Sequence, residues 1–280
     1  MSLAFLLDLL TDYSIFTVMA FGLHIVLMSG QVSLGHAALF GVGAYMSAIL
    51  TTKFRVPFAL ALPLGGVAGA VMGGIIAYLV ARRLRGMYLA IATFALDEAL
   101  ITLALNSEYL GGALGFPHIP LRTNLLVLLL VNGALMFLLW RFERSRFGAS
   151  FRAVADDDVA AGMVGVNVPF MRVLAWVLGG FMTGLGGALH AHRVGVISPT
   201  EFGFSTSVAI LLAPVIGGAR SFWGTMLGAA VITFLPWLVT LTDVESRLML
   251  YGAMYVVIMI FRPHGLIGSR QGRPASVAGG

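Results

Sequence analysis

The chain has 280 residues, of which 59% are hydrophobic and 10% are charged, and its mean hydropathy is +0.96. A soluble domain is usually about half apolar and about a quarter charged, so this composition excludes an ordinary soluble domain. The formal net charge of +5 does not indicate nucleic-acid binding here, because the basic residues lie in short loops between apolar segments. There is no cysteine, so the sequence gives no basis for disulfide or thiol chemistry.

Apolar segments separated by polar or glycine-rich residues predict membrane helices. In chain order they are Tyr13–Met28, Ser33–Leu50, Pro57–Val80, Met87–Leu105, Leu125–Trp140, Met171–His190, Ser205–Ile216, Trp223–Val239 and Leu248–Phe261. The second and seventh could be partial or re-entrant spans. We therefore predict an all-α polytopic membrane bundle with about 8–10 transmembrane segments. Residues 1–268 are expected to form a single transmembrane domain, and residues 269–280 a flexible C-terminal tail.

The basic residues predict the orientation of the chain. If the loop that contains Arg82, Arg83 and Arg85 is cytoplasmic and the segments alternate, twelve of the 17 Lys and Arg residues fall on the cytoplasmic side. Cytoplasmic loops of membrane proteins carry an excess of Lys and Arg. The distribution therefore predicts an N-terminus outside and a C-terminus in the cytoplasm.

The longest polar interruption runs from Arg141 to Pro169, on the predicted cytoplasmic side. Apolar side chains recur there at helical spacing and predict one short amphipathic helix. They are Phe151, Val154, Ala155, Val159, Ala160, Met163 and Val164. The aspartates at 156–158 are expected near its start, where carboxylates oppose the positive end of the helix dipole. Such a helix either lies in the lipid headgroups or docks a cytoplasmic partner.

Enzymatic motifs are missing from the sequence. A Walker A loop needs Gly-Lys followed by Ser or Thr, but the single lysine, Lys53, lies between Thr52 and Phe54. The sequence also lacks GxSxG and HExxH motifs. His190 and His192 could bind a metal ion, but neither has a cysteine or an acid beside it. We expect no catalytic residue, no metal site and no cofactor in this chain.

A few polar features interrupt the apolar segments. Asp97 and Glu98 lie within the fourth segment, and an acid at membrane depth either has a function or hydrogen-bonds a neighbouring helix. The roles of His24 and His36 are equally open. Two Gly- and Ser-rich clusters, at residues 29–36 and 217–221, place polar backbone where membranes tolerate it only inside protein or beside a cavity.

Several stretches of the sequence resemble a known family. They are Ser29–Ala38 (SGQVSLGHAA), Gly41–Tyr45 (GVGAY), Arg85–Thr93 (RGMYLAIAT), Phe147–Asn167, Ile197–Pro199, Gly217–Gly224 and Phe261–Leu266. These blocks resemble, in the same order, those of the branched-chain amino acid ABC permeases of the LivH/LivM type. The block at 85–93 resembles the LivM branch in particular.

The resemblance implies the permease subunit of an ATP-binding-cassette importer for branched-chain amino acids, located in the bacterial cytoplasmic (inner) membrane. It implies as partners a second homologous permease subunit, two cytoplasmic ATPase subunits that bind ATP and Mg, and a periplasmic or external substrate-binding protein. Transport would proceed by alternating access between the two sides of the membrane.

The resemblance also implies two sets of functional residues. Docking of the ATPase is expected at Arg152, Asp156, Asp157, Asp158, Ala160, Ala161, Gly165 and Asn167. The translocation pathway is expected to be lined by Gln31, Ser33, His36, Tyr45 and Glu98. One departure affects the docking contacts, because Val159 stands where such segments often carry an acid before the Ala-Ala pair.

Three alternative functions remain open at this point. The family also transports related amides and ureas, so the chain could be an ABC permease for urea or short amides. A stand-alone secondary transporter or channel would need no ATPase, although such proteins usually carry more intramembrane charges. A membrane-embedded enzyme could use His36 or Glu98 as an acid or base, but the sequence shows no second catalytic group at a defined spacing.

Overall fold

The computed structural model describes residues 3–219, 221–238, 244–261 and 266–267. The predicted C-terminal tail, 269–280, lies outside these residues. In the described part the regular elements are helices, and the β contact is one isolated bridge between Phe116 and Ile197. The all-α prediction is confirmed.

Each predicted apolar segment falls on one helix of the structure. These helices are α1 (Leu3–Met28), α2 (His36–Thr52), α3 (Phe58–Ile76), α4 (Gly86–Leu105), α5 (Leu125–Glu143), α8 (Val168–Val194), α9 (Phe204–Gly217), α10 (Phe222–Leu238) and α11 (Val244–Phe261). The largest boundary error is at α1, which begins ten residues before Tyr13. The residues that the prediction left out include Asp8, whose carboxylate pairs with Arg193 of α8 at 2.6 Å.

The shorter elements connect these helices. They are the π-helical turn η1 (Ala77–Ala81), the 3₁₀ turns η2 (Glu108–Leu110), η3 (Gly112–Leu114) and η4 (Pro199–Phe202), and the helices α6 (Arg146–Asp156) and α7 (Asp158–Met163). Six helices in the described part are long and apolar enough to cross a membrane. Shorter apolar helices extend over His36–Thr52 and Phe222–Pro236. The 17 residues of α2 rise only about 26 Å, less than the roughly 30 Å hydrocarbon core.

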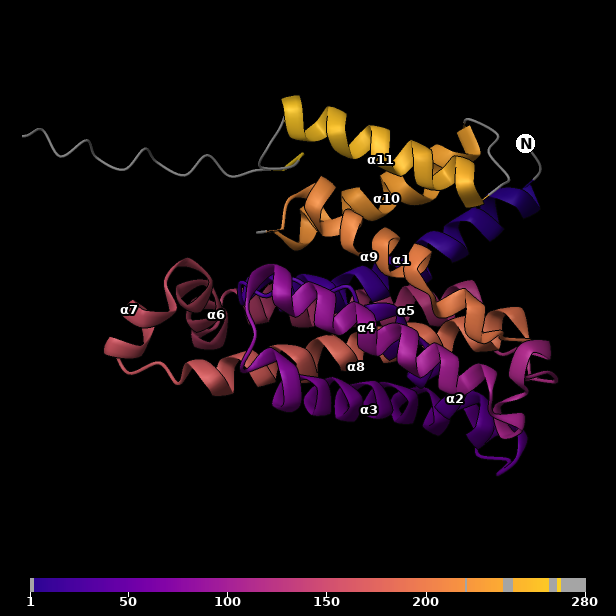
Figure 1. Ribbon diagram of the computed structural model, residues 1–280. Helices are drawn as coiled ribbons and strands as arrows, with labels where there is room; N and C mark the ends of the chain where they lie inside the picture. Colours follow the sequence, from indigo (N-terminus) through magenta and orange to yellow (C-terminus); the bar gives the residue numbers. More distant parts are fainter. Residues whose placement is uncertain (1–2, 220, 239–243, 262–265, 268–280) are drawn as a thin grey trace, which may run out of the picture.

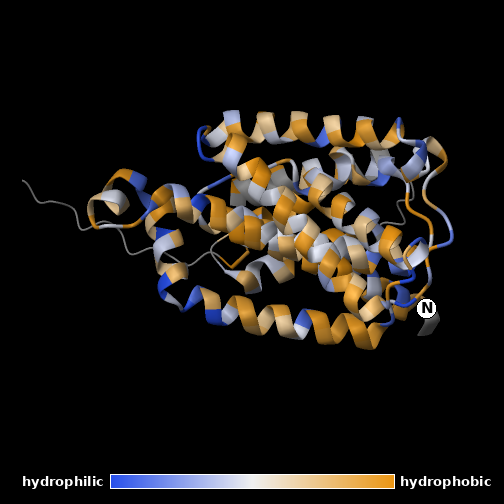
Figure 2. Cartoon of the chain, turned by 90° about the horizontal axis from the view of Figure 1, so that it is seen from below, coloured by the Kyte–Doolittle hydropathy of each residue, from blue (hydrophilic) through white to orange (hydrophobic). Residues whose placement is uncertain are grey.

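The long helices run between two ends of the molecule (Figure 1). One end carries α6 and α7, which project beyond the bundle; the N-terminus lies at the opposite end. Helices α10 and α11 lie along one side, beyond α1 and α9. Hydrophobic residues predominate along the outer helices, and the hydrophilic stretches gather at the two ends (Figure 2). This distribution is that of a polytopic membrane bundle.

Glycines bring the central helices into backbone contact. Helix α8 packs against α1, α2 and α3. At Gly43 of α2, an added Cβ atom would overlap the backbone of Gly184 in α8. At Gly69 of α3, it would overlap the carbonyl oxygen of Gly180, also in α8. Small residues allow such close approach between membrane helices, and these glycines mediate it here.

This packing gives a stability prediction. We expect Gly43→Ala to lower the free energy of unfolding by about 1–3 kcal/mol, because the methyl group forces α2 away from α8. The melting temperature of the purified chain in detergent, followed by size-exclusion chromatography after heating, measures the loss. The matched control is Gly133→Ala in α5, where an added Cβ meets nothing within 4 Å. Equal melting temperatures for both variants would contradict the packing argument.

Candidate functional site

The chain between α1 and α2 turns into the bundle, and Gln31 fixes it there. Gln31 is 4% exposed, and its amide nitrogen donates to the Ser29 hydroxyl at 2.8 Å and to the Arg172 carbonyl at 3.3 Å. Its amide oxygen accepts from the indole N–H of Trp176 at 3.2 Å. The side chain therefore binds α8, and both ends of its amide group are hydrogen-bonded within the chain. Its role in the translocation pathway stays a prediction.

Ser33 and His36 are buried beside this turn. The Ser33 hydroxyl lies 3.0 Å from Nδ1 of His36 and accepts the Gly35 N–H at 3.1 Å. The His36 ring lies 5.3 Å from the Trp176 ring, and its Nε2 has no hydrogen-bond partner among the described residues. An added Cβ at Gly35 would meet the backbone of Thr93, which lies well inside α4. Helix α2 thus begins within the bundle rather than at its surface.

Asp97 provides an acceptor where α2 begins. It is fully buried, and its Oδ2 accepts from the Ser207 hydroxyl of α9 at 2.9 Å. The Ser207 oxygen in turn accepts the N–H of Ala37 at 3.2 Å, and the N–H of Ala38 faces the Asp97 carboxylate. First-turn N–H groups have no partner within their own helix, and a carboxylate there opposes the helix dipole favourably. Asp97 therefore links α4, α9 and α2.

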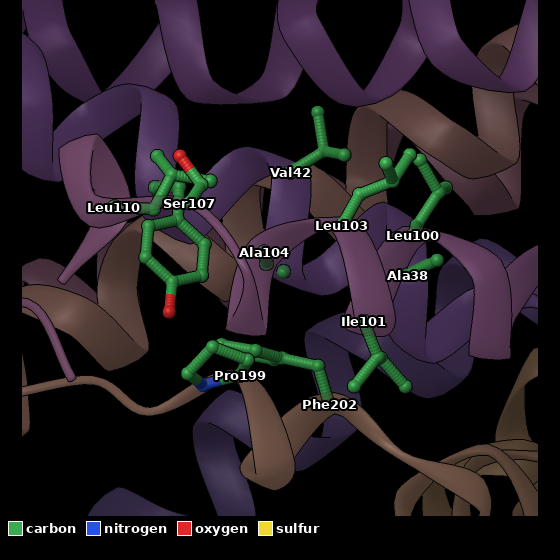
Figure 3. Close-up of a pocket in the computed structure, with 12 residues that line it drawn as sticks. Ala38, Val42, Leu100, Ile101, Leu103, Ala104, Ser107, Leu110, Pro199 and Phe202 are labelled. Atoms are coloured by element: carbon green, nitrogen blue, oxygen red, sulfur yellow. The ribbon is translucent and has the colours of Figure 1, made fainter. Parts of the chain in front are cut away.

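Tyr45 lines an apolar cavity of about 330 Å³ between α2, α4 and η4 (Figure 3). The other lining residues are Ala38, Gly41, Val42, Leu100, Ile101, Leu103, Ala104, Ser107, Leu110, Pro199 and Phe202. The Tyr45 hydroxyl has no hydrogen-bond partner among the described residues. The volume is within the range of small-molecule sites, and the walls suit an aliphatic group.

Glu98 lies apart from the other predicted pathway residues. It follows Asp97 in the sequence but points about 100° further around α4, since successive helical residues turn by that angle. It is half-buried and does not line the cavity of Tyr45. The structure therefore groups Gln31, Ser33 and His36, places Tyr45 on a cavity nearby, and leaves Glu98 on another side of α4.

The cytoplasmic helix that the sequence predicted is two helices, so the prediction of one continuous helix is wrong. Asp157 separates them, with an extended backbone at φ −157° and ψ 109°. Its carboxylate caps α7 by accepting the N–H groups of Val159 at 2.9 Å and Ala160 at 3.0 Å. Asp157 and Asp158 do stand at a helix start, as expected, whereas Asp156 is the last residue of α6.

Asp158 connects α7 to two membrane helices. Its Oδ2 lies 2.8 Å from the guanidinium of Arg85, which precedes α4, and 2.7 Å from that of Arg172 in α8. Arg172 is only 8% exposed, so it needs this carboxylate as a partner. Sequence reasoning missed this group, because Arg85 lies far from Asp158 in the chain and no local pattern pairs the two.

The other predicted docking residues shape the lobe formed by α6 and α7. Arg152 donates to the Glu143 carbonyl at 2.8 Å, and Asn167 caps α8 by accepting the N–H of Phe170 at 3.1 Å. Gly165 has a φ of +89°, a left-handed conformation that ends the segment after α7.

Two predicted docking residues of α7 are not its most exposed ones. Ala160 is half-buried and Ala161 is 3% exposed, and their role in docking stays a prediction. Val159, Met163 and Val164 are instead 67%, 79% and 79% exposed. We call these three residues the α7 apolar face. Their helical spacing was visible in the sequence, but which side of the helix packs inward was not.

Histidines bind neighbouring elements rather than one another. His24 lies 3.0 Å from Oε1 of Glu143 and 2.9 Å from the Thr225 hydroxyl, which fastens α10 to α1 and α5. His190 pairs with Glu201 at 3.1 Å, whereas His192 contacts Ser47 at 3.0 Å and a backbone carbonyl. The described residues contain no group of three metal-ligating side chains.

Comparison with known proteins gives consistent matches. A family model described as "Branched-chain amino acid transport system / permease component" matches residues 5–260. The high-affinity branched-chain amino acid transport system permease protein LivM of Salmonella typhimurium is 30% identical, over 93% of this chain and 69% of its own length. A probable LivH permease of Methanocaldococcus jannaschii is 26% identical over 81% and 80%. The autoinducer 2 import system permease protein LsrC of Photorhabdus luminescens is 24% identical over 84% and 71%.

The Asp97 link gives a second stability prediction. We expect Asp97→Ala to lower the free energy of unfolding by about 1–3 kcal/mol, because Ser207 and the start of α2 lose their acceptor. Asp97→Asn keeps an acceptor oxygen and should lose less. The adjacent Glu98→Ala, which removes a carboxylate without such partners, is the control and should melt like the unmodified chain. If Asp97→Ala also melts like the unmodified chain, Asp97 does not hold these helices together.

Proposed function

Because the chain belongs to the branched-chain amino acid transport permease family, we propose that it is the membrane-spanning subunit of an ATP-binding-cassette importer for branched-chain amino acids. The observation that carries the proposal is the match of one permease model to residues 5–260, which include the six described helices that are long and apolar enough to span the membrane. The apolar cavity beside Tyr45 supports an aliphatic cargo.

Energy for transport comes from other subunits. The only lysine, Lys53, is not part of a Gly-Lys-Ser/Thr loop, so this chain has no Walker A motif. ATP and Mg are therefore bound by two cytoplasmic ATPase subunits. A second homologous permease subunit completes the membrane part, and an external binding protein delivers the amino acid. The assembly lies in the bacterial inner membrane, with the α6–α7 end in the cytoplasm.

The α7 apolar face is the docking surface for the ATPase. Val159, Met163 and Val164 are 67–79% exposed. They belong to α7 and the residue after it, at the end of the bundle from which α6 and α7 project (Figure 1). Large apolar side chains clustered on a projecting surface are typical of protein interfaces. The α6–α7 lobe extends beyond the end of the bundle, where a cytoplasmic partner can reach it (Figure 1).

Movement of α7 reaches the transport helices through Asp158. The carboxylate binds Arg85 before α4 and Arg172 in α8. Arg85 is 66% exposed, so its ion pair contributes only about 0.2–1 kcal/mol to stability. A contact that adds little stability but joins two moving parts serves to transmit displacement.

A charged substitution on the α7 apolar face tests the docking proposal. Met163→Glu should reduce co-purification of the ATPase, and with it amino acid uptake, by about tenfold or more, because a carboxylate replaces a desolvated contact. The matched control is Leu114→Glu, a 95% exposed residue at the opposite end of the bundle, which should retain the ATPase. Normal ATPase recovery and uptake with Met163→Glu would refute docking at this face.

Transmission is tested separately at Arg85. We expect Arg85→Ala to keep its melting temperature and its bound ATPase but to lose several-fold in amino acids transported per ATP hydrolysed, since α7 is no longer tied to α4. Transport and hydrolysis are measured together in proteoliposomes containing the complete importer. The neighbouring exposed Arg83, for which no ion pair occurs among the described residues, gives the control Arg83→Ala. Equal coupling ratios for the two variants would exclude this role for Arg85.

A further inference from the structure

The outward faces of α3 and α5 are those expected against lipid. Helix α3 contains no charged residue, and α5 contains none before Arg141 in its last turn. Large apolar side chains cover both faces. They include Leu60, Val71 and Ile75 on α3 and Leu126, Leu130 and Phe137 on α5, which are 47–66% exposed.

The outward face of α4 is mixed: large apolar side chains such as Ile91 and Leu103 are 57% and 67% exposed, but small and polar residues lie between them. Ala95, Ala99 and Thr102 are exposed there, and Glu98 lies half-buried at the edge of the same stripe. We call these four residues the α4 polar face. Glu98 is the thirteenth of the 20 residues of α4, about 18 Å along the helix from its start, so it lies near the middle of the span.

The carboxylate of Glu98 has no partner among the residues that the structure describes. No described side chain forms an ion pair or hydrogen bond with it. Asp97 occupies the buried side of α4, where Ser207 reaches it, but Glu98 points away from that side. Thr102, the other polar residue of the face, already has a hydrogen-bond partner, because its hydroxyl donates to the Glu98 carbonyl at 2.8 Å.

An unpaired carboxylate cannot face hydrocarbon at this depth. Ionisable side chains in membrane helices lie against protein or a water-filled space, because burying their charge in lipid is costly. The described part of the chain offers Glu98 no cation or donor, so another protein surface or water has to lie outside α4 at this level. The alanines on either side of Glu98 leave room for that water and for a solute.

We propose that the α4 polar face lines the aqueous translocation pathway and that Glu98 binds the α-ammonium group of the amino acid in transit. The inference rests on the proposed function. A carboxylate is the complement of an ammonium group, and an exposed carboxylate holds it weakly enough to release it. The second permease subunit closes the other side of the pathway, because a passage open to lipid would not hold water.

Cysteine accessibility tests the aqueous face directly. The chain contains no cysteine, so Ala95→Cys and Ala99→Cys each introduce one thiol into it. The matched control is Ala134→Cys, an exposed alanine at mid-length of α5. The complete importer in membrane vesicles is treated with a charged, membrane-impermeant methanethiosulfonate, and labelling of this chain is followed by mass. Only a hydrated thiol ionises and reacts, so both α4 variants should label at least about tenfold faster than Ala134→Cys.

The role of Glu98 is tested by uptake. Glu98→Gln should lower leucine uptake by about tenfold while Ala99→Cys in the same chain still labels, because the pathway remains wet but has lost its anionic site. Unchanged uptake with Glu98→Gln would refute the proposal that Glu98 binds the ammonium group. If the α4 cysteines label as slowly as Ala134→Cys, the proposal that the α4 polar face borders water is wrong. If the unmodified chain co-purifies no ATPase and supports no ATP-dependent uptake, the proposed function fails instead, whatever the labelling shows.

Discussion

The backbone of α8 lies directly against the backbones of α2 and α3, because glycines on all three helices leave no side chain between them. Gly43 and Gly69 face Gly184 and Gly180 so closely that a single methyl group would not fit. In a bilayer, lipid tails are as apolar as the helices, so the hydrophobic effect does not hold helices together. Close packing supplies that attraction here, and α1, which also packs on α8, completes a platform of four helices.

This platform makes an internal helix start possible. Helix α2 begins inside the bundle, where no bulk water satisfies its first-turn N–H groups. Ser207 and Asp97 supply acceptors from α9 and α4, and Gln31 fixes the preceding turn to Trp176 of α8. The polar backbone that the Gly- and Ser-rich sequence indicated is therefore buried in protein. Moving any one of these helices away would leave polar groups unsatisfied in an apolar medium.

Apolar segments predicted the helices because the bilayer requires apolar side chains along every span. Each of the nine segments coincides with a described helix, although α1 begins ten residues earlier than predicted. Hydropathy could not distinguish the roles of Asp97 and Glu98, since aspartate and glutamate are equally hydrophilic and only the structure shows that they point in different directions. Similarly, helical spacing found the apolar residues near 151–164 but not the cap at Asp157 that divides them. The ion pairs of Asp158 with Arg85 and Arg172 join distant parts of the chain, and one sequence contains no signal for such pairs.

Helix α4 connects the features that transport requires. Its start is tied to α7 through Arg85, its buried side holds Asp97 and the cavity wall, and its outward side carries Glu98. It is also less buried than α8, with 22% against 44% of its spanning window inside the chain. The glycine contacts make α2, α3 and α8 rigid with respect to one another, whereas α4 is held by a few polar links. Asp158 pairs with Arg172 of the platform helix α8 as well as with Arg85 before α4, so in the proposed mechanism a displacement of α7 acts between α4 and the platform, beside the space that Glu98 borders.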